Sequence, residues 1–282
     1  MDLIFLWNIR LLILHPSPRR SKDIKCTLKE FAMDEAPESK ALSYACGQPC
    51  STRHITVNDL GIPVGRNLHH ALWYLRSQAH RTLWVDALSI NQENIAERNQ
   101  QAMQMSNIYR NSWRVLVWLG IPSTDSDEAL KCIASCHYHD KEFTPNNLLP
   151  IKRLFEREYW SRLWIVQECL DAKDARIQCG NTYVSWDKLD TFRARCRFAW
   201  KYSVHESALL VFGSHAFKLL LHHTMFGLQQ KTPLRALLHA FSSSKCVDVR
   251  DKIYGLVGLA KGGGKLEIDY SYSVSRVFGD VI

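Results

Sequence analysis

Short apolar segments alternate with longer amphipathic segments through the middle of this chain. The apolar run TLWVDAL at 82–88 predicts a buried strand, and apolar residues at helical spacing follow from about Asn94 to Asn111. A second apolar run, RVLVWLG at 114–120, precedes another amphipathic segment that begins near Asp125. Strands that alternate with helices of this length predict right-handed crossovers and a largely parallel sheet. We therefore expect an α/β fold with helices on both faces of the sheet.

The two ends of the chain differ from this middle part. The first 45 residues contain three short apolar runs separated by Pro, Ser and charged residues, which indicate strands. Hairpins are predicted at Asn58 and Asp59 and again at Gly180 and Asn181, and the stretch 187–241 has mostly helical spacing. We therefore divide the chain into a strand-rich extension (1–40), a core (41–186) and a helical part (187–282). We expect this helical part to be truncated at its end.

Composition limits the possible settings for this protein. Nine cysteines without regular spacing favour a reducing compartment, so a cytoplasmic location is expected. The apolar start at 3–14 is too short to span a membrane, and CxxxCH at 132–137 lacks a second pair of ligands for zinc, so no metal is expected. The net charge of +8 permits anion binding, but the basic residues are scattered among acidic ones. Nucleic acid is therefore not among the expected partners, and anion or nucleic-acid binding stays an alternative on charge alone.

Three blocks of sequence resemble those of the fungal heterokaryon incompatibility family. The first contains ALSYACG at 41–47, with Cys46 where the family usually has Trp, followed by ITVND and NLHHALWYLR. The second is LWVDALSINQENIAERNQQAMQMSNIYRNSWRVLVWLG at 83–120, with Ser89 where Cys is common. The third is YWSRLWIVQE at 159–168, and VDVRDKIYGLVGLA and IDYSYS complete the C-terminal pattern. These blocks cover most of the chain.

The resemblance implies a function that periodicity alone does not. Members of this family respond to non-self signals during fungal cell fusion and start programmed cell death. It also implies a flavodoxin-like sheet, because the family is considered related to Toll/interleukin-receptor (TIR) domains, some of which hydrolyse NAD. We expect a cytoplasmic effector that acts through protein partners and self-association as a homo-oligomer. No cofactor is required on this interpretation, NAD is a candidate substrate, and whether the chain is an enzyme stays open.

Glu168 is the candidate catalytic residue. It follows Trp160 and Trp164 at four-residue spacing on a helix predicted over 159–172, and indoles would remove water from its carboxylate and raise its pKa. WIVQE also resembles the segment that carries the catalytic glutamate of NAD-cleaving TIR domains. A fixed carboxylate can stabilise the oxocarbenium charge that forms when the nicotinamide–ribose bond breaks. The alternative is a structural ion pair of Glu168 with Arg162 or Arg98.

The candidate ligand-binding residues lie near the predicted carboxyl ends of the strands, where open parallel sheets bind their ligands. They are Ser43, Tyr44, Asp86, Asn91, Gln92, Arg162 and Trp164. Ser43 and Tyr44 end one strand and Asp86 follows the next, so we expect these three to share a crevice. Two alternatives are structural: Asn91 could cap the following helix, and Asp86 could pair with Arg98 or Arg114.

Overall fold

Four parallel strands form the centre of one mixed sheet. The computed structural model describes residues 8–17, 23–47, 51–136, 145–202, 210–226, 232–262, 266–279 and 281. The central strands, in spatial order, are β6 (Arg81–Trp84), β3 (Lys40–Tyr44), β7 (Arg114–Trp118) and β8 (Ala175–Cys179). In chain order these are the second, first, third and fourth of the set, which is the flavodoxin-like arrangement. The predicted α/β fold is confirmed.

Further strands flank this centre on both sides, and they pair antiparallel except for β2 with β4, which are parallel. The whole sheet has the order β5-β4-β2-β1-β6-β3-β7-β8-β9. The flanking strands are β1 (Asn8–Leu14), β2 (Lys25–Ala32), β4 (Thr52–Val57), β5 (Leu60–Gly65) and β9 (Thr182–Ser185). Because β1 pairs with β6, the strands from the predicted extension belong to the same sheet as the core. Asn58 and Asp59 have φ angles of 49° and 63°, as the turn between β4 and β5 requires.

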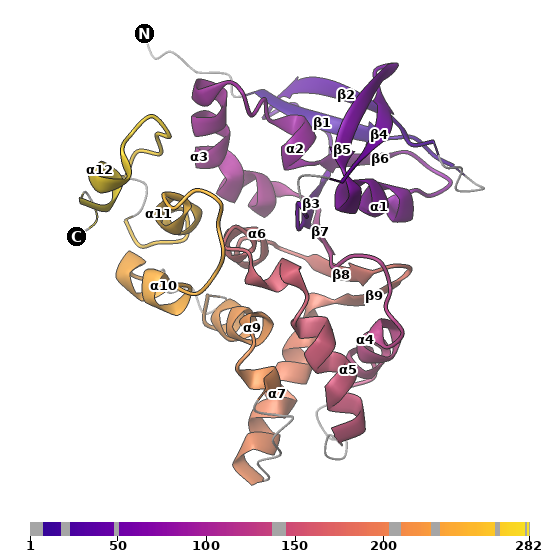
Figure 1. Ribbon diagram of the computed structural model, residues 1–282, viewed down its shortest axis with the longest axis vertical. Helices are drawn as coiled ribbons and strands as arrows, with labels where there is room; N and C mark the ends of the chain where they lie inside the picture. The colour runs from indigo at the N-terminus through magenta and orange to yellow at the C-terminus, as the bar shows by residue number, and fades with distance from the viewer. Residues whose placement is uncertain are drawn as a thin grey trace.

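Helices cover both faces of the central strands (Figure 1). On one face, α1 (Arg66–Leu75) buries Leu68, Leu72 and other apolar residues against Leu42 of β3. On the other face, α3 (Ile95–Asn111) buries Met105, Ile108 and Tyr109. Because side chains alternate along a strand, successive residues of β3 pack into the core on one face of the sheet and then into the core on the other. The connection from β3 to β6 through α1 and the connection from β6 to β7 through α3 therefore run on opposite faces of the sheet. The point where the connections change faces lies at β3.

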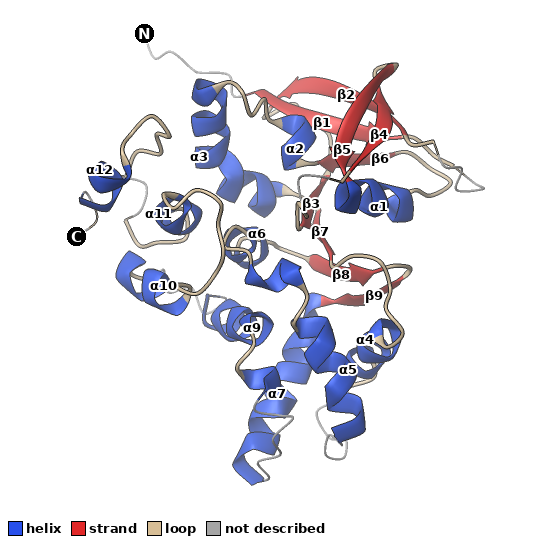
Figure 2. Cartoon of the chain, in the orientation of Figure 1, coloured by secondary structure: helices blue, strands red, loops and turns tan. Residues whose placement is uncertain are grey.

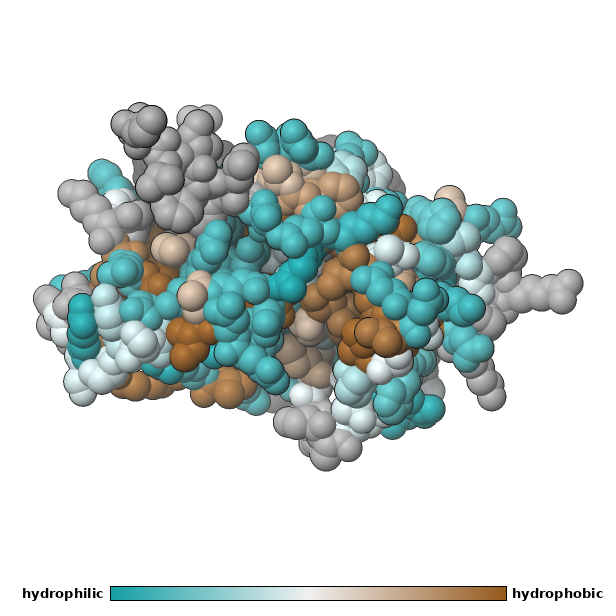
Figure 3. Space-filling model, turned by 90° about the horizontal axis from the view of Figure 1, so that it is seen from above, coloured by the Kyte–Doolittle hydropathy of each residue, from teal (hydrophilic) through white to brown (hydrophobic). Residues whose placement is uncertain are grey.

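The C-terminal half adds a helical layer, and Figure 2 shows the strands gathered in one part of the molecule and these helices in another. Its helices are α4 (Ser126–Ala134), α5 (Pro145–Phe155), α6 (Ile165–Leu170), α7 (Trp186–Tyr202), α9 (His215–Phe226), α10 (Leu234–Ala240), α11 (Asp251–Val257) and α12 (Val274–Gly279). Within the described ranges, no helix combines the length and the apolar character needed to cross a bilayer. On the face seen in Figure 3, hydrophilic residues surround separate hydrophobic areas.

The helix predicted over 159–172 is not continuous, which corrects the sequence interpretation. A short 3-10 helix, η1 (Glu158–Ser161), is followed by Arg162 in an extended conformation, and α6 begins only at Ile165. Lys245 causes the break, because its carbonyl accepts a hydrogen bond from Leu163 N (2.8 Å) and its own N–H donates to the Ser161 carbonyl (2.6 Å). These long-range hydrogen bonds replace helical ones. Trp160, Trp164 and Glu168 therefore do not share one helix face.

Candidate functional site

A small cavity of about 110 Å³ lies beside the carboxyl ends of β3 and β6. Five of its lining residues were predicted from the sequence: Asp86, Gln92, Arg162, Trp164 and Glu168. The lining also includes Arg98, Tyr270 and the apolar residues Ile90, Ala102 and Met105. They come from α2 (Asp86–Ser89), α3, α6 and the segments before α3, α6 and α12. The other three predicted residues, Ser43, Tyr44 and Asn91, are not part of the lining, and a ligand site at this edge of the sheet stays a prediction.

Glu168 lines this cavity and ends a chain of hydrogen bonds. Its carboxyl group is buried, with 2% of the residue exposed, and Ser43 Oγ donates to Oε2. Ser43 Oγ lies 2.6 Å from Tyr159 Oη, which lies 3.4 Å from Cys169 Sγ. Since a hydroxyl has a single proton, Tyr159 donates to Ser43, and the Cys169 thiol donates to Tyr159. All the donors in this chain point toward the carboxylate, so each bond strengthens the next.

Burial raises the pKa of Glu168 to about 7. The charge of Arg162 and the hydrogen bond from Ser43 act in the opposite direction and limit the increase, while the charge of Asp86 adds to it. A group with a pKa near 7 is protonated in about half of the molecules at neutral pH. The Glu168 carboxyl group can therefore give or take a proton under ordinary cellular conditions.

Arg162 connects Glu168 to the end of β3. Its Nη1 donates a hydrogen bond to the backbone carbonyl of Tyr44, and its charge acts on Glu168 and Asp86. The other arginine offered as a structural partner, Arg98, lies 4.0 Å from Asp248. Its guanidinium carbon is 3.7 Å from the centre of the Tyr270 ring. Arg162 is therefore the cation that acts on the Glu168 pKa, while Arg98 forms part of the opposite wall.

Asp86 and Tyr44 meet as predicted. Tyr44 is buried, and its pKa is raised well above the usual value by burial, by the charge of Asp86 and by a hydrogen bond to that carboxylate. Asp86 Oδ1 also accepts a hydrogen bond from Ala87 N (2.7 Å). The ion pairs suggested for Asp86 are not those formed, because Arg98 and Arg114 pair with Asp248 and Asp174. Asp86 thus lines the cavity with a carboxylate that is bonded to Tyr44 and Ala87.

The C-terminal part supplies one wall of the cavity. Asp251, at the start of α11, accepts a hydrogen bond from Tyr270 Oη (2.7 Å) and another from the Trp164 side chain. Arg250 donates to the carbonyls of Tyr270 and Tyr272. From the sequence, neither Asp251 nor Tyr270 was placed at the site. The one sequence feature that pointed to these two residues was the match of VRDKIY and IDYSYS to the C-terminal pattern of the family.

Two sequence predictions at this site are wrong. Asn91 does not cap α3: Asn94 does, with its side chain accepting from Glu97 N (3.2 Å), while Asn91 Oδ1 accepts from Glu93 N (3.1 Å) and shapes the preceding turn. Trp160 does not line the cavity with Glu168. Its indole donates to the Leu154 carbonyl (3.0 Å) in the core, so Trp164 is the indole at the cavity.

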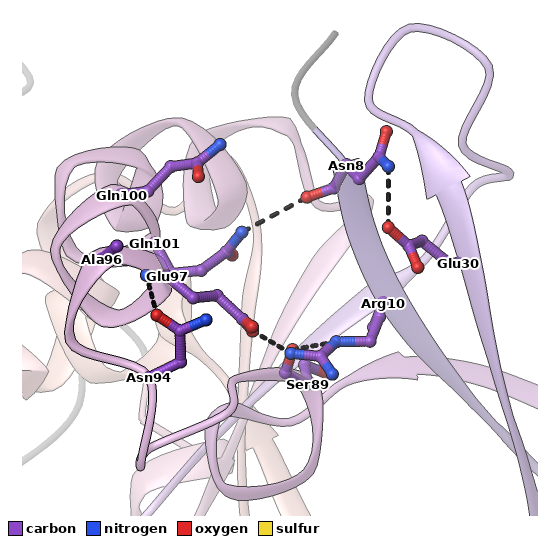
Figure 4. A pocket seen from close by; sticks show the side chains of 9 residues that line it. All are labelled: Asn8, Arg10, Glu30, Ser89, Asn94, Ala96, Glu97, Gln100 and Gln101. Carbon is purple, nitrogen blue, oxygen red and sulfur yellow. Dashed lines mark hydrogen bonds and ion pairs between the residues drawn. The ribbon is translucent and has the colours of Figure 1, made fainter. Parts of the chain in front are cut away.

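A second cavity, of about 440 Å³, lies between the first strands and α3 (Figure 4). Arg10 Nε donates to the Ser89 carbonyl (3.0 Å), and its Nη2 forms an ion pair with Glu97. Gln101 Nε2 donates to the Asn8 carbonyl (3.2 Å). The polar groups around this cavity largely bond one another. These bonds link β1 to α3, and we assign no binding or catalytic role to this cavity. In the described part of the chain, no group of three His, Cys, Asp or Glu residues could hold a metal ion.

Comparisons with known proteins bear on the same region. Residues 40–168 match the family described as heterokaryon incompatibility protein (HET). The chain is 26% identical to heterokaryon incompatibility protein 6, OR allele, of Neurospora crassa, and the alignment covers 97% of this chain. The chain spans 50% of the length of that relative. No solved structure gives a significant match, so the comparisons do not support the expected kinship with TIR domains.

Proposed function

We propose that this chain, which carries a heterokaryon incompatibility domain over residues 40–168, is an effector of fungal non-self recognition. In this proposal it starts programmed cell death by self-association and by contacts with other proteins. The name of the Neurospora crassa relative supports the part concerning incompatibility. The death signal, the cytoplasmic location and the partners are expectations that follow from the family resemblance.

One contact carries this proposal. The matched region begins at Lys40 in β3 and ends at Glu168, and Ser43 of that strand donates a hydrogen bond to Glu168. The first strand and the last residue of the domain therefore meet at the cavity. The C-terminal part contacts the same cavity through Tyr270, whose hydroxyl donates a hydrogen bond to Asp251. A signal that changes this cavity can thus act on the domain core and the C-terminal helices together.

The proposal is tested by inducible expression in Neurospora crassa hyphae. We expect cell death, scored by dye entry and colony growth, that increases when the protein is fused to a chemically induced dimerisation module. Tyr270→Ala, which removes a wall of the cavity, should abolish death while the protein still accumulates. Leu60→Ala, which truncates an exposed side chain of the edge strand β5, is the matched control. Growth that does not respond to enforced dimerisation contradicts the proposal.

A second candidate function is NAD cleavage with Glu168 as the residue that stabilises the ribose cation. It is favoured by one observation, the carboxyl group with a pKa of about 7 in a cavity that also contains Arg162. The cavity of about 110 Å³ is smaller than the usual range of about 300 to 1,000 Å³ for small-molecule sites. Glu168 is also only 2% exposed, so in this proposal the cavity wall moves before ribose reaches the carboxylate.

This candidate is tested by incubating oligomerised protein with NAD and measuring the release of nicotinamide. Glu168→Gln keeps the size of the side chain and removes its charge, so it should abolish release, whereas Glu158→Gln changes an exposed glutamate of the preceding segment and should not. If both variants still kill hyphae and NAD levels stay constant, the effector works without this chemistry. The first proposal then stands alone.

A further inference from the structure

The amino ends of the central strands carry a row of cations. Lys40, Arg81 and Arg114 are the first residues of β3, β6 and β7, and Arg176 is the second residue of β8. Side chains alternate along a strand. These four therefore project from the sheet face that also bears Leu42, Leu83 and Leu116 two residues further along β3, β6 and β7. The row lies at the opposite edge of the sheet from the cavity of Glu168.

Two exposed aromatic side chains contact cations of this row, Trp113 at its amino-end side and Tyr183 further along the sheet, opposite Gln178 of β8. Trp113 immediately precedes β7 and is 46% exposed, and Tyr183 in β9 is 54% exposed. Lys40 Nζ and the guanidinium carbon of Arg114 each lie 4.6 Å from the centre of the Trp113 ring. The guanidinium carbon of Arg176 lies 4.1 Å from the Tyr183 ring. Each exposed ring thus has a cation beside it, a combination that suits the stacking of an anionic, aromatic ligand.

The charges in this row are only partly balanced. Asp174 forms an ion pair with Arg114, and Glu38 acts on Lys40. Burial lowers the pKa of Lys40, and the charges of Arg81, Arg114 and Arg176 lower it further. The cations therefore repel one another, and a bound anion would relieve this repulsion. We call Lys40, Arg81, Arg114, Arg176, Trp113 and Tyr183 the basic face.

We propose that the basic face binds single-stranded nucleic acid, with phosphates at its four cations and bases stacked on Trp113 and Tyr183. The row runs diagonally, because Arg81 lies two residues before the level of Lys40 and Arg114, and Arg176 lies two residues beyond it. At about 4.8 Å between strands and about 3.3 Å per residue along them, it spans about 20 Å. This is the length of about six stacked nucleotides at about 3.4 Å each. The same face also presents polar side chains, Gln178 opposite Tyr183 and Ser185 opposite Arg176, which disfavour insertion into a membrane. The sequence conceals this site because the four cations are far apart along the chain.

The test is fluorescence anisotropy of a labelled oligothymidylate of about 12 nucleotides with the full chain. Four phosphate contacts on a single strand predict a slope of about −3 for the logarithm of affinity against the logarithm of salt concentration. Affinity should then fall about 50-fold between about 50 and 200 mM salt. Lys40→Gln with Arg176→Gln should reduce the slope to about −1.4. Lys131→Gln with Lys218→Gln removes the same charge from exposed helix positions and should leave the slope unchanged.

Stacking is tested separately from charge. Tyr183→Ala should weaken binding at least about fivefold, and Tyr183→Phe, which keeps the ring, should bind as the wild type does. Circular dichroism and urea midpoints establish that each variant is folded. The proposal is overturned by no binding at low salt, by equal losses in the Lys131/Lys218 control, or by polyglutamate binding as tightly as the oligonucleotide. Binding to phosphatidylserine vesicles with no binding to the oligonucleotide also overturns it, in favour of a membrane surface.

Discussion

Glu168→Gln should stabilise this protein at high pH and have little effect at low pH. The pKa of Glu168 rises from 4.5 to about 7 on folding, mainly because burial disfavours the charged form. The protonated form therefore contributes stability that is fully present below pH 4.5 and is lost as the pH rises through about 7. At about 1.4 kcal/mol per pH unit, the loss amounts to about 3 kcal/mol. Glutamine has the shape of the protonated acid and avoids this loss.

The assay is urea unfolding of both proteins at a series of pH values from about 4.5 to 8. The difference in free energy of unfolding between Glu168→Gln and the wild type should be small at the acidic end. It should grow to about 3 kcal/mol in favour of the variant at the alkaline end. Glu158→Gln, which changes an exposed glutamate, is the matched control. A difference that stays constant over this range would refute the reasoning, because it would mean that Glu168 keeps one ionisation state throughout.

Three further changes test the contacts around the cavity. Ser43→Ala removes the hydrogen bond that limits the pKa of Glu168, so it should raise that pKa further and cost about 1.5 to 3 kcal/mol of stability above pH 7, as urea unfolding would show. Asp251→Asn weakens the acceptor of Tyr270 Oη and should cost about 1 kcal/mol, with faster proteolysis of the C-terminal segment and unchanged proteolysis elsewhere. Asn94→Ala removes the cap of α3 and should cost about 1 kcal/mol, measured by thermal unfolding against an exposed alanine substitution in mid-helix.

Local patterns were sufficient for most of the elements and for one part of the site. Short apolar runs located β3, β6 and β7, because these strands are buried on both faces, and a hairpin pattern located β8. Helical spacing located α1 and α3, because each helix buries one face. The contact of Tyr44 with Asp86 followed from a topological rule, since the carboxyl ends of neighbouring parallel strands meet at one edge. No side-chain contact had to be known for that prediction. The crevice expected to be shared with Ser43 was not found, because only Asp86 of the three lines the cavity.

The errors arose where distant segments decide the local structure. The helix predicted over 159–172 is interrupted because Leu163 and Ser161 bond Lys245, which is more than 80 residues away. Tyr270 reaches the cavity because its backbone N–H donates to Asn99 Oδ1 (3.0 Å), across 171 residues of sequence. Periodicity carries no information on such contacts. The basic face was missed for the same reason: charge scattered along the sequence is gathered only when the strands align.

The ionisation of Glu168 bears directly on whether the cavity has a chemical role. Glutamine would fill the same space, could accept the hydrogen bond from Ser43 and would avoid a cost of about 3 kcal/mol at alkaline pH. Packing alone therefore does not explain a carboxylate at this position, and the two explanations to separate are a structural interaction with the charge of Arg162 and a functional use of the Glu168 charge or proton. The two measurements on Glu168→Gln must then be read together. A variant that is more stable at high pH and no longer kills hyphae would identify a residue whose charge serves function at the expense of stability. A variant that is more stable and still kills would restrict Glu168 to a structural role and leave the rest of the cavity to carry the signal.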